Sequence, residues 1–273
     1  MIKGPMLIAV APNGARKAKL DHPGLPLTPL ELAKTAVTCL KEGAGMMHFH
    51  VRDNRGKHTL DQAIYRQTLR ELEAAVGSDM LLQVSSEAAG IFQPDEQIEQ
   101  MKRLAPHCLS CGLREFVKEQ KDYDAGHAYF SEMHRAGALV QYILYSPADV
   151  EWYEMLCAEG VLPGKNHLLL FVMGRHGQDV GENFTLQSYV SALKQNNPWM
   201  ACGFGLDEHK IMAQVAKLGG HGRVGFENNH QLPDGSPAPD NSSLVKLTAK
   251  LALSAGRLPA NKLFAESLHK QSD

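Results

Sequence analysis

The chain contains 273 residues, of which 44% are hydrophobic and 21% are charged, so it can bury a sizeable core. This length suits one α/β barrel, typically about 250 residues, or two small domains. The formal net charge of −2 gives no reason to expect a nucleic acid or an anionic membrane surface as a partner. The sequence also lacks a run of about 18 apolar residues that would predict a membrane span.

Five cysteines are scattered along the chain, an odd number that does not suggest a disulfide framework. The expected compartment is therefore a reducing cytoplasm, and residues 1–10 lack the apolar core and cleavage site of a signal peptide. Cys108 and Cys111 form a CxxC pair, which is compatible with redox chemistry or zinc binding. Because no second CxxC accompanies it, we interpret the pair as small core residues.

Strand-like and helix-like segments alternate along the whole chain. The first helix is marked by Thr28 as N-cap, Pro29 at its first position and Glu31 in its first turn, and it ends near Gly43. Short apolar runs predict strands at residues 6–11, 46–50, 81–85, 108–111, 139–145, 167–172, 199–203 and 222–226. Helices are predicted at residues 29–43, 61–76, 95–104, 129–136, 147–159, 185–195, 208–218, 242–255 and 260–270.

Eight strands separated by helices, without a long linker, predict one (β/α)8 TIM barrel over residues 1–273, closed by the C-terminal helices. The alternative, a doubly wound open sheet, lacks the GxGxxG after the first strand that would favour nucleotide binding. In a barrel, the chemistry lies where the strands end and the βα loops begin. The polar residues expected there are Asn13, Arg16, His48, His50, Ser85, Ser86, Ser110, Arg175, Arg223 and Glu227.

The second predicted strand ends in His48-Phe49-His50. Residues i and i+2 of a strand point to one face about 6.6 Å apart, so both imidazoles can bind one cation, although many HxH pairs are ordinary polar residues. Glu227 follows the strand that closes the barrel and can face both histidines, which would make a His2Glu site with an open position, as in catalytic zinc sites. The alternative for Glu227 is a salt bridge to Arg223. An open zinc ion beside arginines suits a substrate that carries a carboxylate and a ketone.

Several motifs together resemble the β-keto acid cleavage enzymes, a family typified by 3-keto-5-aminohexanoate cleavage enzyme. The combination of HxHxR[DE] with GGHxRxGxE is specific, and the resemblance extends over nearly the whole chain. The motifs that carry it are APNGAR at 11–16, DHPGLPLTP at 21–29, HFHVRD at 48–53, GGHGRVGFENN at 219–229 and AP at 238–239.

This resemblance implies a zinc-bearing TIM barrel that uses acetyl-CoA as co-substrate. Such an enzyme converts a β-keto acid and acetyl-CoA into acetoacetate and a new acyl-CoA by retro-Claisen C–C cleavage. By motif, His48, His50 and Glu227 carry over as the zinc ligands, while Ser85 and Arg223 line the active site. The resemblance also implies a homo-oligomer, such as a tetramer.

One departure from the family pattern concerns the acid/base group. The typical member has Glu-Asp-Asn after the last strand, and its Asp is taken as the group that carries the proton. Here the residues are Glu227-Asn228-Asn229, and an Asn228 amide cannot take up that proton. Either another group is the base, or the mechanism differs.

Other departures concern the residues expected to contact the substrate, which are Asn13, Arg16, Cys108 and Ser110. The amino-substrate enzyme has a glutamate where this chain has Arg16, and residues 141–145 lack the glutamates that the family usually carries. An Arg16 that points inward would favour an anionic or polar tail over a cationic one. The alternative is a surface arginine.

The remaining interpretations concern residues outside these motifs and other functions. His221 precedes the last strand and is expected to be structural, at the far end of the barrel. Arg175 and His176 follow the sixth strand and either meet the phosphates of CoA or lie in a solvated loop. Two other functions stay open: a metal-dependent hydrolase or class II aldolase that needs no CoA, and a non-catalytic metabolite-binding barrel.

Overall fold

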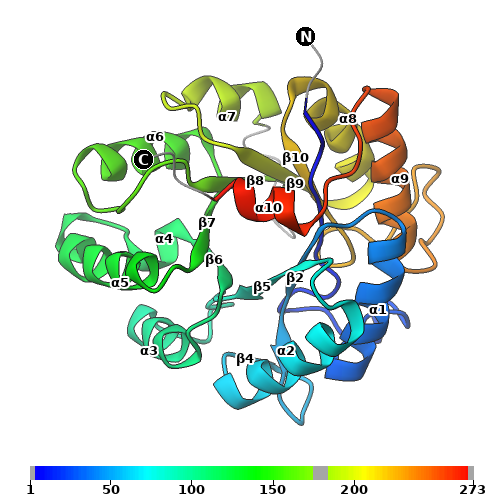
Figure 1. Ribbon diagram of the computed structural model, residues 1–273, viewed down its shortest axis with the longest axis horizontal. Coiled ribbons are helices and arrows are strands. Elements are labelled where there is room, and N and C mark those ends of the chain that lie inside the picture. The colour runs from blue at the N-terminus through cyan, green and yellow to red at the C-terminus, as the bar shows by residue number, and fades with distance from the viewer. Residues whose placement is uncertain (1–3, 175–183, 270–273) are drawn as a thin grey trace.

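A closed barrel of parallel strands forms the centre of the molecule, and helices surround it (Figure 1). The computed structural model describes residues 4–174 and 184–269. Within these ranges, the barrel strands run in the order β1-β10-β9-β8-β7-β6-β5-β2, and every neighbouring pair is parallel. The bounds are β1 (Ile8–Val10), β2 (Met46–Phe49), β5 (Leu81–Ser85), β6 (Cys108–Gly112), β7 (Leu139–Leu144), β8 (Leu168–Met173), β9 (Trp199–Gly203) and β10 (His221–Val224). The predicted TIM barrel is confirmed.

The predicted helices are present in the predicted order, but the helix predicted at 129–136 already begins at Tyr123, and the short helix Leu113–Phe116 was not predicted. Among the described residues the helices are α1 (Pro29–Lys41), α2 (Gln62–Val76), α3 (Pro94–Leu104), α4 (Leu113–Phe116), α5 (Tyr123–Arg135), α6 (Pro147–Ala158), α7 (Leu186–Ala192), α8 (Glu208–Leu218), α9 (Asn241–Ser254) and α10 (Lys262–Ser267), with short 3-10 turns η1 (Gln120–Asp122) and η2 (Gly205–Asp207). The start of α1 is as predicted, since Thr28 and Glu31 form a capping box and Pro29 follows.

Two further local features differ from the prediction. After β2 the chain forms a small antiparallel ribbon of β3 (Val51–Arg52) and β4 (His58–Thr59), with a turn between them. The last barrel strand ends at Val224 rather than at residue 226, because Gly225 adopts a φ of 135° and turns the chain. Glu227 therefore lies in a loop and not on the strand itself.

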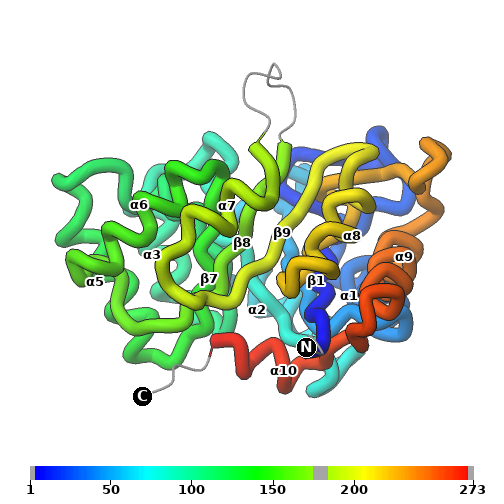
Figure 2. The backbone as a smooth tube through the Cα atoms, turned by 90° about the horizontal axis from the view of Figure 1, so that it is seen from above, coloured from blue at the N-terminus to red at the C-terminus, as the bar shows by residue number. Residues whose placement is uncertain are grey.

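Side chains alternate along the strands between two cores, as the period of a β-strand requires. In β1, Ile8 and Val10 pack outward against the helices, whereas Leu7 and Ala9 belong to the cluster inside the barrel. That inner cluster extends to Ala260 and Ala265, so α10 covers the barrel where its strands begin (Figure 2). The opposite end, where the strands finish, remains available for a site.

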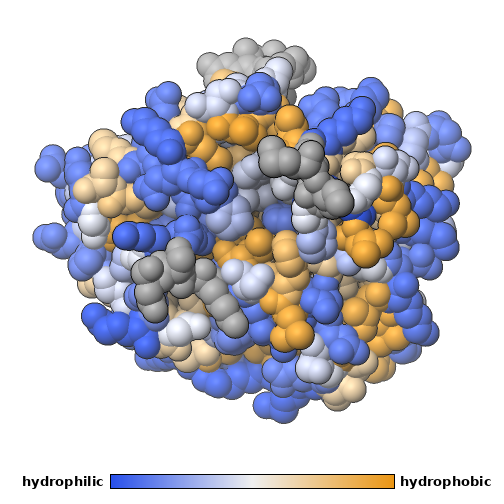
Figure 3. Space-filling view, turned by 45° about the horizontal axis from the view of Figure 1, so that its top comes forward, coloured by the Kyte–Doolittle hydropathy of each residue, from blue (hydrophilic) through white to orange (hydrophobic). Residues whose placement is uncertain are grey.

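The outer surface is mixed in character. Figure 3 shows hydrophilic and apolar residues interspersed over one face of the molecule. Among the described residues, no helix is both long enough and apolar enough to cross a membrane.

Candidate metal and substrate site

The three predicted metal ligands come together at the mouth of the barrel. His48 is on β2 and His50 follows it directly, while Glu227 reaches them from the loop after β10. His48 Nε2 lies 3.1 Å from His50 Nε2, and Glu227 Oε2 lies 3.5 Å from each of these nitrogens. Among the described residues, they form the group of His, Cys and acidic side chains whose ligand atoms all lie within 4.8 Å of one another.

The arrangement fits a divalent metal ion. Ligands at 2.0–2.1 Å from a tetrahedral ion are about 3.3 Å apart, close to the separations observed here. Nδ1 of His48 is 3.1 Å from Gln83 Oε1, a contact in which the ring nitrogen donates and leaves Nε2 free to bind metal. Among the described residues, the buried Oε2 of Glu227 has no hydrogen-bond partner. A buried carboxylate oxygen normally has such a partner, and a bound metal ion would take its place.

The charge states of these residues also suit metal binding. Burial lowers the pKa of His48 well below its usual value, so its imidazole is neutral, as a ligand must be. Burial alone would raise the pKa of Glu227, but the Arg223 guanidinium outweighs burial and holds this pKa well below its usual range. Burial likewise opposes the charge of Arg223, yet the Glu227 carboxylate more than compensates and raises its pKa. Arg223 and Glu227 are thus an ion pair, with Nη2 of Arg223 3.0 Å from Oε1 of Glu227.

The loop after β1 contacts two of the predicted metal ligands, Glu227 and His50. Gly14, with a φ of 63°, passes so close to Glu227 that an added Cβ would be 2.6 Å from Glu227 Cγ. Arg52 donates a hydrogen bond to the Gly14 carbonyl and holds this loop in place. Asn13 Oδ1 accepts from His50 N at 3.2 Å, and its Nδ2 donates to His50 O at 2.9 Å. The Asn13 amide, predicted to contact the substrate, is thus engaged in holding the backbone of His50.

A pocket opens beside the three predicted metal ligands, and several other predicted residues line it. Ser85 and Ser110 are among them, as is Arg223, whose guanidinium is almost fully buried. Ser110 Oγ lies 3.4 Å from His48 Nδ1. The described lining residues are His48, Ser85, Glu87, Ser110, Gly112, Glu115, Ile143, Tyr145, Val172, Phe204, Arg223 and Glu227.

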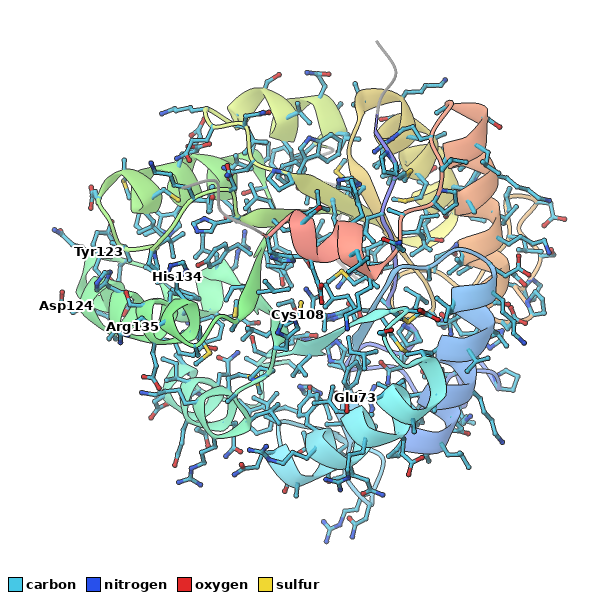
Figure 4. All side chains as sticks on the ribbon, in the orientation of Figure 1. Glu73, Cys108, Tyr123, Asp124, His134 and Arg135 are labelled. Carbon is cyan, nitrogen blue, oxygen red and sulfur yellow. The ribbon has the colours of Figure 1, made fainter. Side chains whose placement is uncertain are left out.

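Three of the predicted residues lie elsewhere. Cys108 is the first residue of β6 and lies at the α10 end of the barrel, where burial raises the pKa of its thiol to about 12 (Figure 4). Arg16 is two-thirds exposed and faces Glu87 across 3.7 Å outside the described pocket lining. Asn228 is buried and also lies outside that lining. Its side-chain atoms Nδ2 and Oδ1 have no hydrogen-bond partner among the described residues. Arg175 and His176 fall outside the described residues.

Sequence reasoning missed two carboxylates that line the pocket, Glu87 and Glu115. Glu87 follows the predicted Ser85-Ser86 pair, so its position at a strand end was the available signal. Arg16 is not among the described lining residues, whereas these two acids are, so the pocket lining gives no support to the expected preference for an anionic tail. His221, which was expected just before the last strand, is instead the first residue of β10, and its Nδ1 accepts a hydrogen bond from Leu7 N at 3.0 Å.

The comparisons with known proteins identify a family for the chain. A family model described as beta-keto acid cleavage enzyme matches residues 5–267. The chain belongs to this family. The family resemblance drawn from the motifs is thereby confirmed.

Members of the family with curated names are similar over nearly their full length. The chain is 24% identical to "3-keto-5-aminohexanoate cleavage enzyme" of Fusobacterium nucleatum over 257 residues, which cover 92% of this chain and 93% of the relative. It is 25% identical to "3-oxoadipate:acetyl-CoA acetyltransferase" of Cupriavidus necator over 275 residues, covering 97% and 94%. These names describe reactions of the relatives.

Solved structures support the fold. The chain superposes on ObcA in its binary complex with oxaloacetate with a TM-score of 0.69 at 15% identity, covering 92% of this chain and 68% of ObcA. A type I 3-dehydroquinate dehydratase from Clostridium difficile gives a TM-score of 0.60 at 10% identity, with coverages of 93% and 94%. At sequence identities this low, the superpositions show a shared barrel fold and not a shared reaction.

Proposed function

We propose that this chain is a zinc-dependent β-keto acid cleavage enzyme that uses acetyl-CoA. It exchanges R–CO–CH2–COO⁻ and CH3–CO–SCoA for CH3–CO–CH2–COO⁻ and R–CO–SCoA. The CH2–COO⁻ unit passes from one acyl group to the other, so acetoacetate is a product whatever R is. The observation that carries the proposal is the His48, His50 and Glu227 cluster beside the buried Arg223, in a member of this family.

Arg223 is suited to an anionic oxygen of the substrate. Its Nε and Nη1 are buried and have no hydrogen-bond partner among the described residues, although its Nη2 binds Glu227. Buried guanidinium donors without partners are costly, and a carboxylate or enolate oxygen would satisfy them. Ser85 and Ser110 add hydroxyl groups to the same pocket. A divalent ion held by His48, His50 and Glu227 would supply Lewis acidity toward the keto oxygen.

An isotope exchange tests this reaction without knowledge of R. Acetoacetate and acetyl-CoA labelled with 13C in the acetyl group should exchange label, because the reaction with R equal to methyl regenerates its own reactants. The zinc-loaded protein should form labelled acetoacetate, and Glu227→Gln should lose both the metal and the exchange. Absence of exchange despite one bound metal per chain would contradict the proposal. Loss of a β-keto acid without acetyl-CoA would instead indicate a hydrolase or aldolase.

The assembly and compartment are proposed on sequence grounds. A homo-oligomer such as a tetramer follows from the family resemblance, and light scattering of the purified protein measures it. A cytoplasmic location agrees with the cysteines, which are all free, since Cys39, Cys108, Cys111, Cys157 and Cys202 form no disulfide.

A further inference from the structure

We infer that Glu87 is the catalytic residue that takes the proton from C2 of the substrate and returns it, a role that rests on the proposed function. Acyl exchange at the carbon between ketone and carboxylate requires that a C–H proton leave and later come back. The amide of Asn228 cannot accept a proton, and Asn228 lies outside the described lining of the pocket. The acid/base group must therefore be another side chain that the substrate meets.

Glu87 lies where such a group is needed. It follows β5 at the barrel mouth, lines the pocket, and places its Oε2 3.8 Å from His50 Nε2. It lies outside the group of three side chains whose ligand atoms are all within 4.8 Å of one another. Its backbone is held on both sides, because His58 Nε2 donates to its carbonyl at 2.8 Å and its N–H donates to Ser85 Oγ at 3.2 Å.

The other two carboxylates of the pocket are already engaged. Glu227 is paired with Arg223 and both imidazoles. Glu115 accepts hydrogen bonds from Ala88 N at 3.1 Å and from Gln97 Nε2 at 2.7 Å.

Glu87 is held less tightly than either of these. In the part of the chain that the structure describes, its carboxylate makes only the long ion pairs to Arg16 at 3.7 Å and to His50 at 3.8 Å. Its side chain is 28% exposed. A carboxylate with acceptor capacity left, at the open side of the pocket, can reach a bound substrate.

The proton and electron balance of the step is complete. The Glu87 carboxylate takes the C2 proton, and the C–H electron pair forms the enolate. C2 then attacks the acetyl carbon of acetyl-CoA, and the CoA thiolate leaves. The thiolate attacks the original keto carbon, the bond from that carbon to C2 breaks, and its electron pair forms the enolate of acetoacetate. Glu87 returns the proton to C2, so no proton is consumed overall.

Deuterium exchange isolates this proton transfer from the acyl transfer. Acetoacetate in D2O, with zinc-loaded protein and without acetyl-CoA, should gain deuterium at C2 faster than the uncatalysed background, as followed by mass spectrometry. Glu87→Gln keeps the size of the side chain but cannot carry the proton, so the protein-dependent exchange rate should fall by about 100-fold or more. Glu87→Asp, which restores a carboxylate, should recover part of it. Glu99→Gln, on the exposed face of α3, is the matched control and should exchange at the normal rate.

The outcomes separate this inference from the proposed function. Metal content and thermal midpoint should be unchanged in Glu87→Gln, and a loss of zinc would overturn the inference by making Glu87 a ligand. Normal exchange in Glu87→Gln would overturn it too, as would loss of exchange in Glu115→Gln but not in Glu87→Gln. If the wild-type protein incorporates deuterium, Glu87→Gln does not, and the wild type transfers no acetyl label, the proposed function fails while the assignment of Glu87 as the proton acceptor holds.

Discussion

At the scale of single residues, Gly14 is a position where the backbone itself makes room for the site. Replacing it with Ala would force a positive φ on a residue with a Cβ and press that Cβ against Glu227. We expect Gly14→Ala to lower the free energy of unfolding by about 1–3 kcal/mol and to weaken metal binding. Gly56→Ala is the control, because Gly56 has a φ of 75° but no atom within 4 Å of its added Cβ.

Urea unfolding of the metal-free proteins, followed by zinc titration, measures both effects of Gly14→Ala. Backbone strain alone would make the two variants equally unstable with normal zinc affinity. Only in Gly14→Ala does the added Cβ press on Glu227, so only this variant should also lose affinity for zinc. Equal zinc affinity in Gly14→Ala and the wild type would show that the added Cβ does not disturb metal binding by Glu227.

His221 makes the stability of the fold depend on pH. Burial, and then Arg257, lower its pKa to about 3, and its neutral Nδ1 accepts the hydrogen bond from Leu7 N. The unfolded chain binds a proton at His221 below a pH of about 6.5, whereas the folded chain does so only near pH 3. The free energy of unfolding should therefore fall as the pH decreases from about 6.5 toward 3.

The contribution of His221 is measured by comparing His221→Gln with the wild type in urea unfolding at several pH values. In that window one proton changes the free energy of unfolding by at most about 1.4 kcal/mol per pH unit. His221→Gln should be less stable than the wild type at pH 7. Its free energy of unfolding should also fall less steeply as the pH decreases. An unchanged slope would assign the acid sensitivity to other groups.

Residue identity in the site was predictable, but side-chain direction was less so. The spacing of His48 and His50 places both on one face of a strand, and that is enough to predict their convergence. Cys108 shares its strand with Ser110 but lies about 6.6 Å nearer the strand start, which puts it at the closed end of the barrel. The position of the Arg16 side chain depends on its partner Glu87, which is distant in the sequence.

At the scale of elements, the cap of α1 positions the loop that precedes it. Thr28 Oγ1 accepts from Glu31 N, and Glu31 Oε2 accepts from Thr28 N at 3.0 Å. We expect Thr28→Ala to lower the free energy of unfolding by about 1 kcal/mol. Thr38→Ala, at an exposed position inside the same helix, should be neutral or slightly stabilising because Ala is the better helix former. Urea unfolding of both variants measures the difference, and equal values would argue against the cap.

The larger elements were predictable from sequence because their apolar periodicity extends over many residues, and the smallest were not. The ribbon of β3 and β4 has two residues per strand, too few to show an alternating pattern. The early end of β10 is caused by Gly225, where an added Cβ would meet Ala11 O at 2.5 Å. This close approach involves the first strand, which lies at the other end of the sequence, so no local pattern predicts it.

At the scale of the whole molecule, the first and last barrel strands are neighbours. Ala9 pairs with Arg223 across this junction, and Glu227 meets His48 just beyond it. Contacts between residues so far apart in sequence form late in folding, because long loops must close first. During synthesis, the histidines leave the ribosome long before their carboxylate partner. The nascent chain therefore cannot bring the three proposed metal ligands together until the loop after β10 has been synthesised and the barrel has closed.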